Sequence, residues 1–240
     1  MLKKILGTIL FFAAVLIAAN FKLVCYGLQQ LKGQLYIVNH AKPIPEVLAD
    51  VSVSDSIKTK LGFIEEIKRF AVDSLSLKPS ENYTTFFDQQ NRPVMWVLTA
   101  APRFKLESYT WYYPLLGRLS YKGFFDKNKG LVEKNKLSQT GLDTDLSPTG
   151  GWSTLGWFKD PVLSNMLRKN EGALAELIIH ELTHGTLYIK GDVEFNENLA
   201  TFIGEQGAIQ YLEAKYGKSS LPLKIYSERW RMKMFMAPIS

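Results

Sequence analysis

The sequence contains little cysteine and histidine: one cysteine and three histidines among 240 residues. The lone Cys25 cannot form an internal disulfide, so it leaves the redox compartment undefined. No internal repeat and no low-complexity linker is present. The net charge of +6 comes from dispersed lysines without an arginine-rich run, so nucleic acid is not an expected partner. With 46% hydrophobic and 22% charged residues, the chain is long enough for one substantial globular core.

The N-terminus has the pattern of an export or anchor segment. Lys3 and Lys4 precede an apolar run that ends at Ala19, which is typical of a basic n-region followed by an h-region. Three fates are open: retention as an anchor reaching about Leu28, cleavage after Ala19, or lipidation of Cys25. In each case the chain is either attached to a membrane or exported. The part of the chain after this segment would then lie on the extracytoplasmic (periplasmic) side. The alternative is a buried N-terminal core helix.

We therefore predict two parts, an N-terminal signal or membrane-anchor segment over residues 1–28 and one domain over residues 29–240.

Two of the histidines lie four residues apart, and a glutamate follows the first: His180, Glu181 and His184. Positions i and i+4 share one face of a helix, so both imidazoles can reach one metal ion. Glu181 lies beside that face and can hold and deprotonate a water molecule at the metal. Residues 172–189 lack proline and Asn170 precedes them as a candidate cap, which favours a helix. The alternative is a buried helix whose histidines are satisfied by core partners.

A catalytic zinc ion needs a third protein ligand. The residues after the motif predict a second helix, with Asn196 as its N-cap and Glu197 in its first turn. The resulting helical hairpin would bring Glu197 back to the histidines and leave one coordination position open, as in catalytic zinc sites. Glu194 and Glu205 compete for this role. A first-turn glutamate favoured by the helix dipole is the alternative interpretation of Glu197.

The remaining pattern predicts a mainly helical α+β fold with a small sheet. Helices are expected over residues 51–78, 127–141 and 226–234, and a further helix is expected to begin at Asp160. A buried strand over 94–100 is expected to pair in a hairpin with 83–88. The aromatic residues between 111 and 125 predict a core beneath an irregular loop, with a substrate-pocket wall as the alternative. Residues 153–158 are a candidate edge strand that would bind a substrate backbone.

With these residues in view, the chain resembles the bacterial predicted aminopeptidases, which are zinc metallopeptidases of the gluzincin type. The resemblance spans residues 30–213 and rests on HELTH at 180–184 and FNENLATFIGEQGA at 195–208, supported by WYYPLLGRLSYKGFF at 111–125 and STLGWFKDPVLSNML at 153–167. It implies a zincin-like catalytic domain in which His180, His184 and Glu197 bind Zn²⁺ and Glu181 is the catalytic base. Similar proteins continue with more helix after the last predicted one, so we expect a chain truncated at its C-terminus.

The expected activity is zinc-dependent hydrolysis of peptide bonds in a peptide or protein substrate, as an aminopeptidase. Candidates to stabilise the oxyanion are Tyr188, Tyr211 and the aromatic residues at 109–113. Asp192 is a candidate partner for a zinc-binding histidine, with a solvated loop aspartate as the alternative. No recognisable motif binds a substrate α-amine, so exopeptidase and endopeptidase action both stay open. The alternative functions are a membrane-anchored zinc-binding protein without turnover and a purely structural zinc site.

Overall fold

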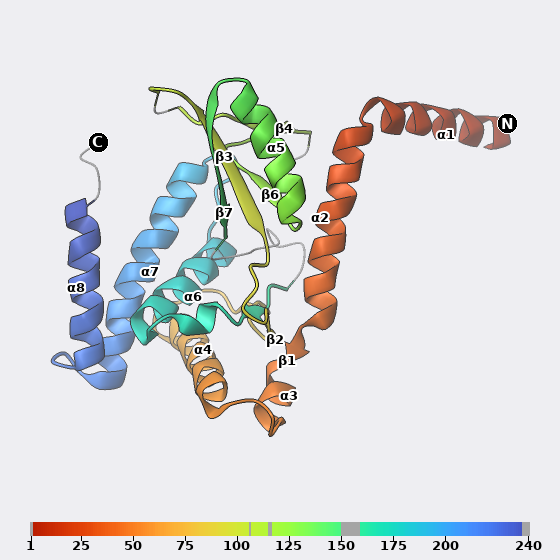
Figure 1. The fold of residues 1–240 in the computed structure, drawn as a ribbon. Helices are drawn as coiled ribbons and strands as arrows, with labels where there is room; N and C mark the ends of the chain where they lie inside the picture. The colour runs from red at the N-terminus through yellow and green to blue at the C-terminus, as the bar shows by residue number, and fades with distance from the viewer. Residues whose placement is uncertain (1, 106, 115–116, 150–158, 237–240) are drawn as a thin grey trace. The chain divides into compact units, whose positions relative to one another are not determined.

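The computed structural model describes residues 2–105, 107–114, 117–149 and 159–236 (Figure 1). The chain divides into two compact units, residues 1–40 with 92–152 and residues 41–91 with 153–240. The described residues form a mainly helical structure with small sheets, which confirms the predicted α+β class. The predicted substrate-binding strand at 153–158 lies outside the described residues.

The first unit begins with two consecutive helices, α1 (Leu2–Ala19) and α2 (Phe21–His40). A turn at Asn20 separates them, and the chain changes direction there (Figure 1). The anchor segment that the sequence predicts to reach about Leu28 is therefore interrupted at Asn20. Among the helices that the structure describes, none is both long enough and apolar enough to cross a bilayer.

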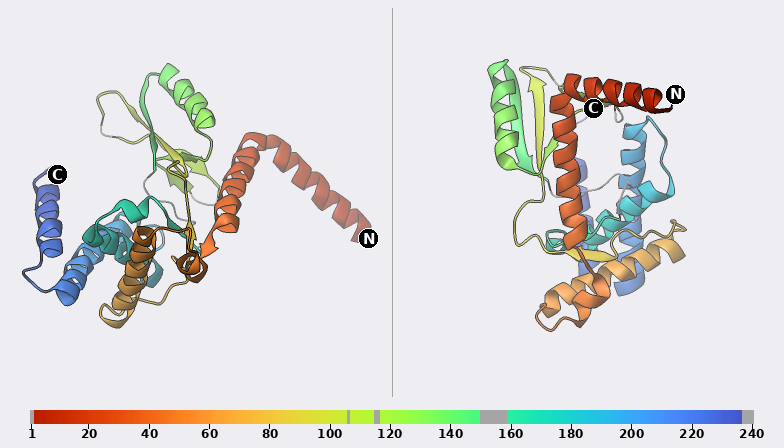
Figure 2. Two further views of the ribbon diagram at one scale, coloured as in Figure 1. Left: turned by 60° about the horizontal axis from the view of Figure 1, so that its bottom comes forward. Right: turned by 90° about the vertical axis from the view of Figure 1, so that its right-hand side faces the viewer.

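A three-stranded antiparallel sheet forms the centre of the first unit. Its middle strand is β3 (Trp96–Pro102), which pairs with β6 (Lys122–Phe124) on one edge and with β7 (Leu142–Pro148) on the other. Helix α5 (Lys127–Gln139), whose N-cap Asp126 accepts a hydrogen bond from the backbone of Asn128, lies along β3 and β7 (Figures 1 and 2). A separate two-stranded ribbon joins β4 (Trp111–Tyr113) to β5 (Gly117–Leu119).

Aromatic side chains contribute to the core of this unit, as the sequence predicts. Trp111 and Phe124 are buried together with apolar residues of the sheet and of α5, namely Leu98, Ala100 and Leu137. Helix α2 is tied to β6 because the Tyr26 hydroxyl and the Gln30 amide both donate hydrogen bonds to the carbonyl oxygen of Gly123, at 2.9 and 3.1 Å.

The predicted hairpin between residues 83–88 and 94–100 is wrong. Strand β2 (Thr85–Phe87) belongs to the second unit, where it pairs antiparallel with β1 (Lys42–Pro43) and parallel with β8 (Val162–Leu163). The reason is that β7 covers one edge of β3 along its whole length and β6 pairs with the other edge. Sequence proximity therefore gave the wrong partner.

No helix begins at Asp160, contrary to the sequence prediction. The backbone N–H of Asp160 donates to Asn82 Oδ1 at 3.0 Å, and its carbonyl oxygen accepts from the N–H of Tyr83 at 2.6 Å. These bonds hold the segment extended beside the chain that leads into β2, and β8 follows directly. A short 3₁₀ turn, η1 (Met166–Arg168), precedes the next helix.

Among its described residues, five helices complete the second unit: α3 (Ile44–Ala49), α4 (Asp55–Asp73), α6 (Glu171–Thr186), α7 (Val193–Tyr216) and α8 (Leu221–Met236). Helix α4 lies within the helix predicted over residues 51–78, and it buries Leu61, Ile64 and Ile67. Helix α6 contacts α4, α7 and α8 (Figure 1), and its own buried residues make it the centre of this group.

Helix α7 approaches the backbone of α6 closely at Gly204. A Cβ atom at this position would lie 2.8 Å from the carbonyl oxygen of Glu176 and 3.1 Å from Cβ of His180. Neither atom belongs to the flexible end of a side chain, so neither can move aside easily. The separation between the two helices at His180 therefore depends on a residue without a side chain.

We expect Gly204→Ala to destabilise the protein by about 1–3 kcal/mol, because overpacking forces the two helices apart. Gly62→Ala on α4 is the matched control, since nothing lies within 4 Å of a Cβ atom there. Without a clash, a helical glycine replaced by alanine gains about 0.5–1 kcal/mol. Urea unfolding of both variants measures the difference. A Gly204→Ala protein as stable as Gly62→Ala would contradict the close approach.

Candidate metal centre

Helix α6 carries the motif and begins where the sequence predicts. Asn170 is its N-cap, and the Asn170 side-chain oxygen accepts a hydrogen bond from the backbone N–H of Ala173 at 2.9 Å. His180 and His184 lie one turn apart on the helix, so their rings project from the same face. Between them, Leu182 and Thr183 are buried on the side of α6 that packs into the unit. The burial pattern thus leaves the two histidines at the edge of the core.

Helix α7 begins four residues earlier than the sequence predicts. Its N-cap is Asp192, whose carboxylate accepts a hydrogen bond from the N–H of Phe195 at 3.0 Å. Asn196 is therefore not the cap but an internal residue of the helix, and Glu197 follows it. The prediction failed because both Asp192 and Asn196 are good capping residues, and Asp192 comes first. This cap bond gives the Asp192 carboxylate a local role, and its contact with a zinc-binding histidine stays a prediction.

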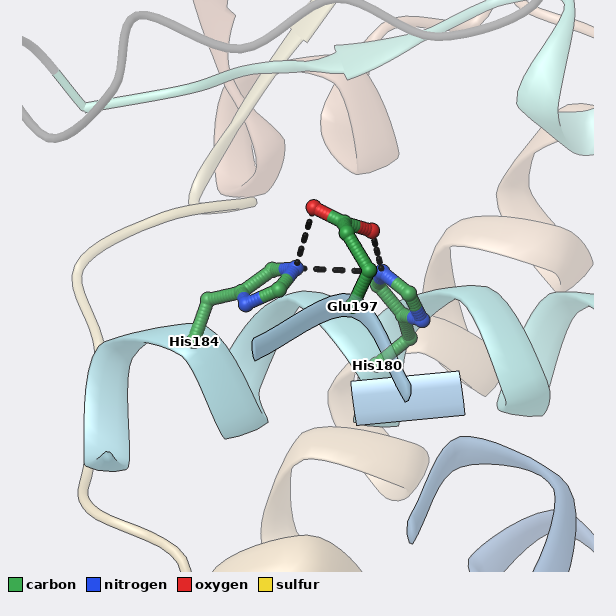
Figure 3. Close-up of side chains that lie close together, drawn as sticks. All are labelled: His180, His184 and Glu197. Atoms are coloured by element: carbon green, nitrogen blue, oxygen red, sulfur yellow. Dashed lines mark hydrogen bonds and ion pairs between the residues drawn. The ribbon is translucent and has the colours of Figure 1, made fainter. Parts of the chain in front are cut away.

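The structure brings together His180, His184 and Glu197 (Figure 3). The two Nε2 atoms are 3.1 Å apart, and each lies 3.5 Å from one carboxylate oxygen of Glu197. The potential ligand atoms of the three residues all lie within 4.8 Å of one another. Within the described part of the chain, neither Glu194 nor Glu205, the competing residues, belongs to this group.

These three side chains fit a metal ion on chemical grounds. Burial, and next the neighbouring His184, lower the pKa of His180 and favour the neutral imidazole, which is the form that binds metals. In the form that binds metals, the two imidazole rings and the Glu197 carboxylate turn electron pairs toward one region, and a cation there would relieve their mutual repulsion. The Glu197 side chain is 57% exposed and each histidine 21%, so the cluster is open on one side.

One feature departs from the usual surroundings of a metal-binding histidine. Such a ring commonly donates its second N–H to a carboxylate or a carbonyl oxygen. Among the residues that the structure describes, the buried Nδ1 of His184 has no hydrogen-bond partner. The orientation of the His184 ring is therefore fixed by packing and by its contacts with His180 and Glu197.

Glu181 lies beside the cluster in a half-buried position. Burial, and then the nearby charges of Asp160 and Glu197, raise the pKa of its carboxyl group to about 7. A cation bound at the cluster would act in the opposite direction and favour the carboxylate. The glutamate of the motif is thus close to the potential ligands and sensitive to their charge.

The residues that face Glu181 from outside the motif were not predicted from the sequence. Asp160 is almost fully buried, and its charge reaches both Glu181 and the buried Tyr83. Burial, and then the charges of Glu181 and Asp160, raise the pKa of Tyr83. Tyr83 also has a backbone φ of 61°, a left-handed conformation that is uncommon outside glycine. No local pattern could indicate this neighbourhood, because Tyr83, Asp160 and Glu181 belong to three separate segments of the chain.

The candidates for oxyanion stabilisation differ in their placement. The Tyr211 hydroxyl donates to a carboxylate oxygen of Glu66 at 3.3 Å, so it is directed toward α4 and not toward the cluster. Tyr188 is exposed, and its ring and the His184 ring form a T-shaped pair with the centroids 6.4 Å apart. Of these two tyrosines, Tyr188 is the one that lies beside the site. The aromatic residues at 109–113 belong to the first unit.

The fold and the cluster together define a class: a mainly helical α+β protein with a candidate histidine–histidine–carboxylate metal site. The chain belongs to the family described as "Putative aminopeptidase", whose model matches residues 25–238. This match confirms the resemblance inferred from the motifs and extends it over most of the chain. No curated protein and no solved structure matches the chain.

We expect Glu197→Ala to weaken zinc binding by more than about 100-fold, because it removes one of three ligands, whereas loss of an outer partner costs about 10–100-fold. Competition with a chromophoric chelator measures the affinity. Glu194→Ala and Glu205→Ala are the matched controls, since these glutamates lie on the same helix but outside the cluster. Zinc affinity lost in either control and retained in Glu197→Ala would place the third ligand elsewhere.

Proposed function

We propose that this protein is a zinc-dependent peptidase of the gluzincin type, and that it acts as an aminopeptidase. The observation that carries the proposal is the convergence of His180, His184 and Glu197 beside Glu181. Two imidazoles and one carboxylate form a known ligand set of catalytic zinc, which leaves a coordination position free for water or substrate. Family membership supports peptide bonds as the target of hydrolysis.

When bound, zinc would polarise the scissile carbonyl and lower the pKa of water toward about 7. The protein's own part begins with Glu197, whose exposed carboxylate and two histidine neighbours would hold the ion at the open side of α6. Because the ligands come from two helices that pack directly on each other, the ion would lie on a rigid support.

Glu181 is the proposed general base and acid. Its carboxylate accepts the proton of the attacking water and then donates that proton to the leaving amine nitrogen. The proton gained in the first transfer is lost in the second, so Glu181 returns to its starting state after each turnover. Partial burial suits this role, because it keeps the carboxylate poorly solvated and raises its pKa toward neutral pH.

We further propose an extracytoplasmic location. The support is the N-terminal pattern of Lys3 and Lys4 followed by the apolar helix α1, which is typical of an export signal. The peptide or protein substrate would then be met outside the cytoplasm.

Glu181→Gln is expected to lower kcat by about 10²–10⁴-fold, since the amide cannot accept the proton. Zinc content should stay at one ion per chain, because Glu181 is not a proposed ligand. Glu171→Gln, in the first turn of the same helix, is the control and should retain activity. Full activity of Glu181→Gln would show that the proposed base is wrong.

A peptide series tests the aminopeptidase part of the proposal in the same assay. Each peptide is offered with a free and with an acetylated N-terminus, and released products are identified by mass. We expect cleavage after the first residue of the free peptides only. Equal cleavage of the acetylated peptides at internal bonds would establish endopeptidase action in its place.

A further inference from the structure

Asn196 is a buried polar residue directly before Glu197, with 2% of its surface exposed. Its side-chain amide pairs in both directions with the backbone of Ile189. The Asn196 Nδ2–H donates to the Ile189 carbonyl oxygen at 2.8 Å, and the Ile189 N–H donates to Asn196 Oδ1 at 2.8 Å. Both polar ends of the amide are therefore occupied by one residue of the preceding loop, which fixes the orientation of the amide group.

This pair closes the connection between the two helices that carry the cluster. Ile189 lies three residues after the end of α6, and Asn196 lies in the first turn of α7. Within the loop, the Asp192 N–H donates to the Ile189 carbonyl oxygen at 3.3 Å, and Gly191 takes a left-handed φ of 88°. The Asn196 N–H donates in turn to the Asp192 carbonyl oxygen at 3.2 Å. The Asn196 side chain thus adds a cross-link from the helix to the far end of its own loop.

Glu197 needs such a constraint because its carboxylate spans two partners. Each oxygen lies 3.5 Å from a different histidine nitrogen, so a shift of the start of α7 along α6 would lengthen at least one of these distances. Functional groups of this kind must be held to within about 0.5 Å by the residues around them. Gly204 fixes the packing of α7 on α6 at His180, about 10 Å further along the helix from Glu197. A second fixed point near Glu197 is therefore required.

We propose that Asn196 is a positioning residue for the metal centre: by binding the backbone of Ile189, it sets the place of Glu197 relative to His180 and His184. Its amide is not a ligand, because both of its ends are engaged with the loop. The proposal rests on the proposed zinc site and assigns a function to a buried amide that the sequence pattern predicts to be a helix cap.

Zinc affinity of the full-length protein tests the proposal. In Asn196→Leu, a side chain of similar size keeps the packing and loses both hydrogen bonds. We expect the zinc dissociation constant, measured by chelator competition, to rise by about 10–100-fold. Cobalt-loaded Asn196→Leu should also show an altered visible absorption band, because the ligand geometry around the ion changes.

Gln89→Leu is the matched control. Gln89 is a buried amide of the same unit, and its Oε1 accepts from the backbone N–H of Asn165 at 2.9 Å, outside the metal cluster. It should lower the thermal stability of the metal-free protein and leave zinc affinity and the cobalt spectrum unchanged. An Asn196→Leu protein with wild-type zinc affinity, or an equal loss in Gln89→Leu, would overturn the positioning role. Absence of zinc binding by the wild type would overturn the proposed function and this role together.

Asn196→Asp provides a second test if Asn196→Leu does not fold. Aspartate still accepts from the Ile189 N–H but turns an oxygen toward the Ile189 carbonyl. Its negative charge alone would strengthen cation binding, so a weaker zinc affinity reports the lost N–H donor. An affinity equal to or above that of the wild type would contradict the proposal.

Discussion

The direct packing of α7 on α6 is the constraint on which the metal centre depends. Gly204 lets the backbones approach beside His180, and small residues continue this face of α7 through the core: Ala200, Gly207 and Ala208. The short connection between the two helices then returns the chain so that Glu197 faces both histidines. The position of Glu197 in the cluster therefore depends on both the close packing of the helices and the short connection between them. A larger side chain at Gly204 would push the two helices apart and change the geometry of the cluster.

The second feature of the site is a group of three neighbouring carboxylates. Asp160, Glu181 and Glu197 are near enough for two of the carboxylates to raise the pKa of the third, which is an unfavourable arrangement in partly buried surroundings. A divalent cation would offset that repulsion, so metal binding and folding stability are expected to be coupled. The three neighbouring carboxylates repel one another when no cation is bound. The same carboxylates would favour a bound ion, and the ion would keep Glu181 ionised.

Local patterns in the sequence were enough to predict the helix of the motif and the approach of Glu197. The cap at Asn170 and the apolar run on α6 act within one element, so they can be recognised without tertiary structure. The misassigned cap at Asn196 shows the limit, because its amide is used by a loop residue seven positions earlier. The predicted hairpin and the neighbours of Glu181 depend on strand partners and on segments far apart in the chain, which no local pattern encodes.

X-ray absorption at the zinc edge of the loaded protein tests the metal centre most directly, because it reports the atoms around the ion without reference to activity. We expect two imidazole nitrogens at about 2.0–2.1 Å, with the remaining ligands being oxygen, in a coordination number of four or five. Glu197→Ala should remove one oxygen and keep both imidazoles. A sulfur neighbour at about 2.3 Å, which only Cys25 or a methionine can supply, or an oxygen shell without imidazoles, would contradict the assignment of His180, His184 and Glu197.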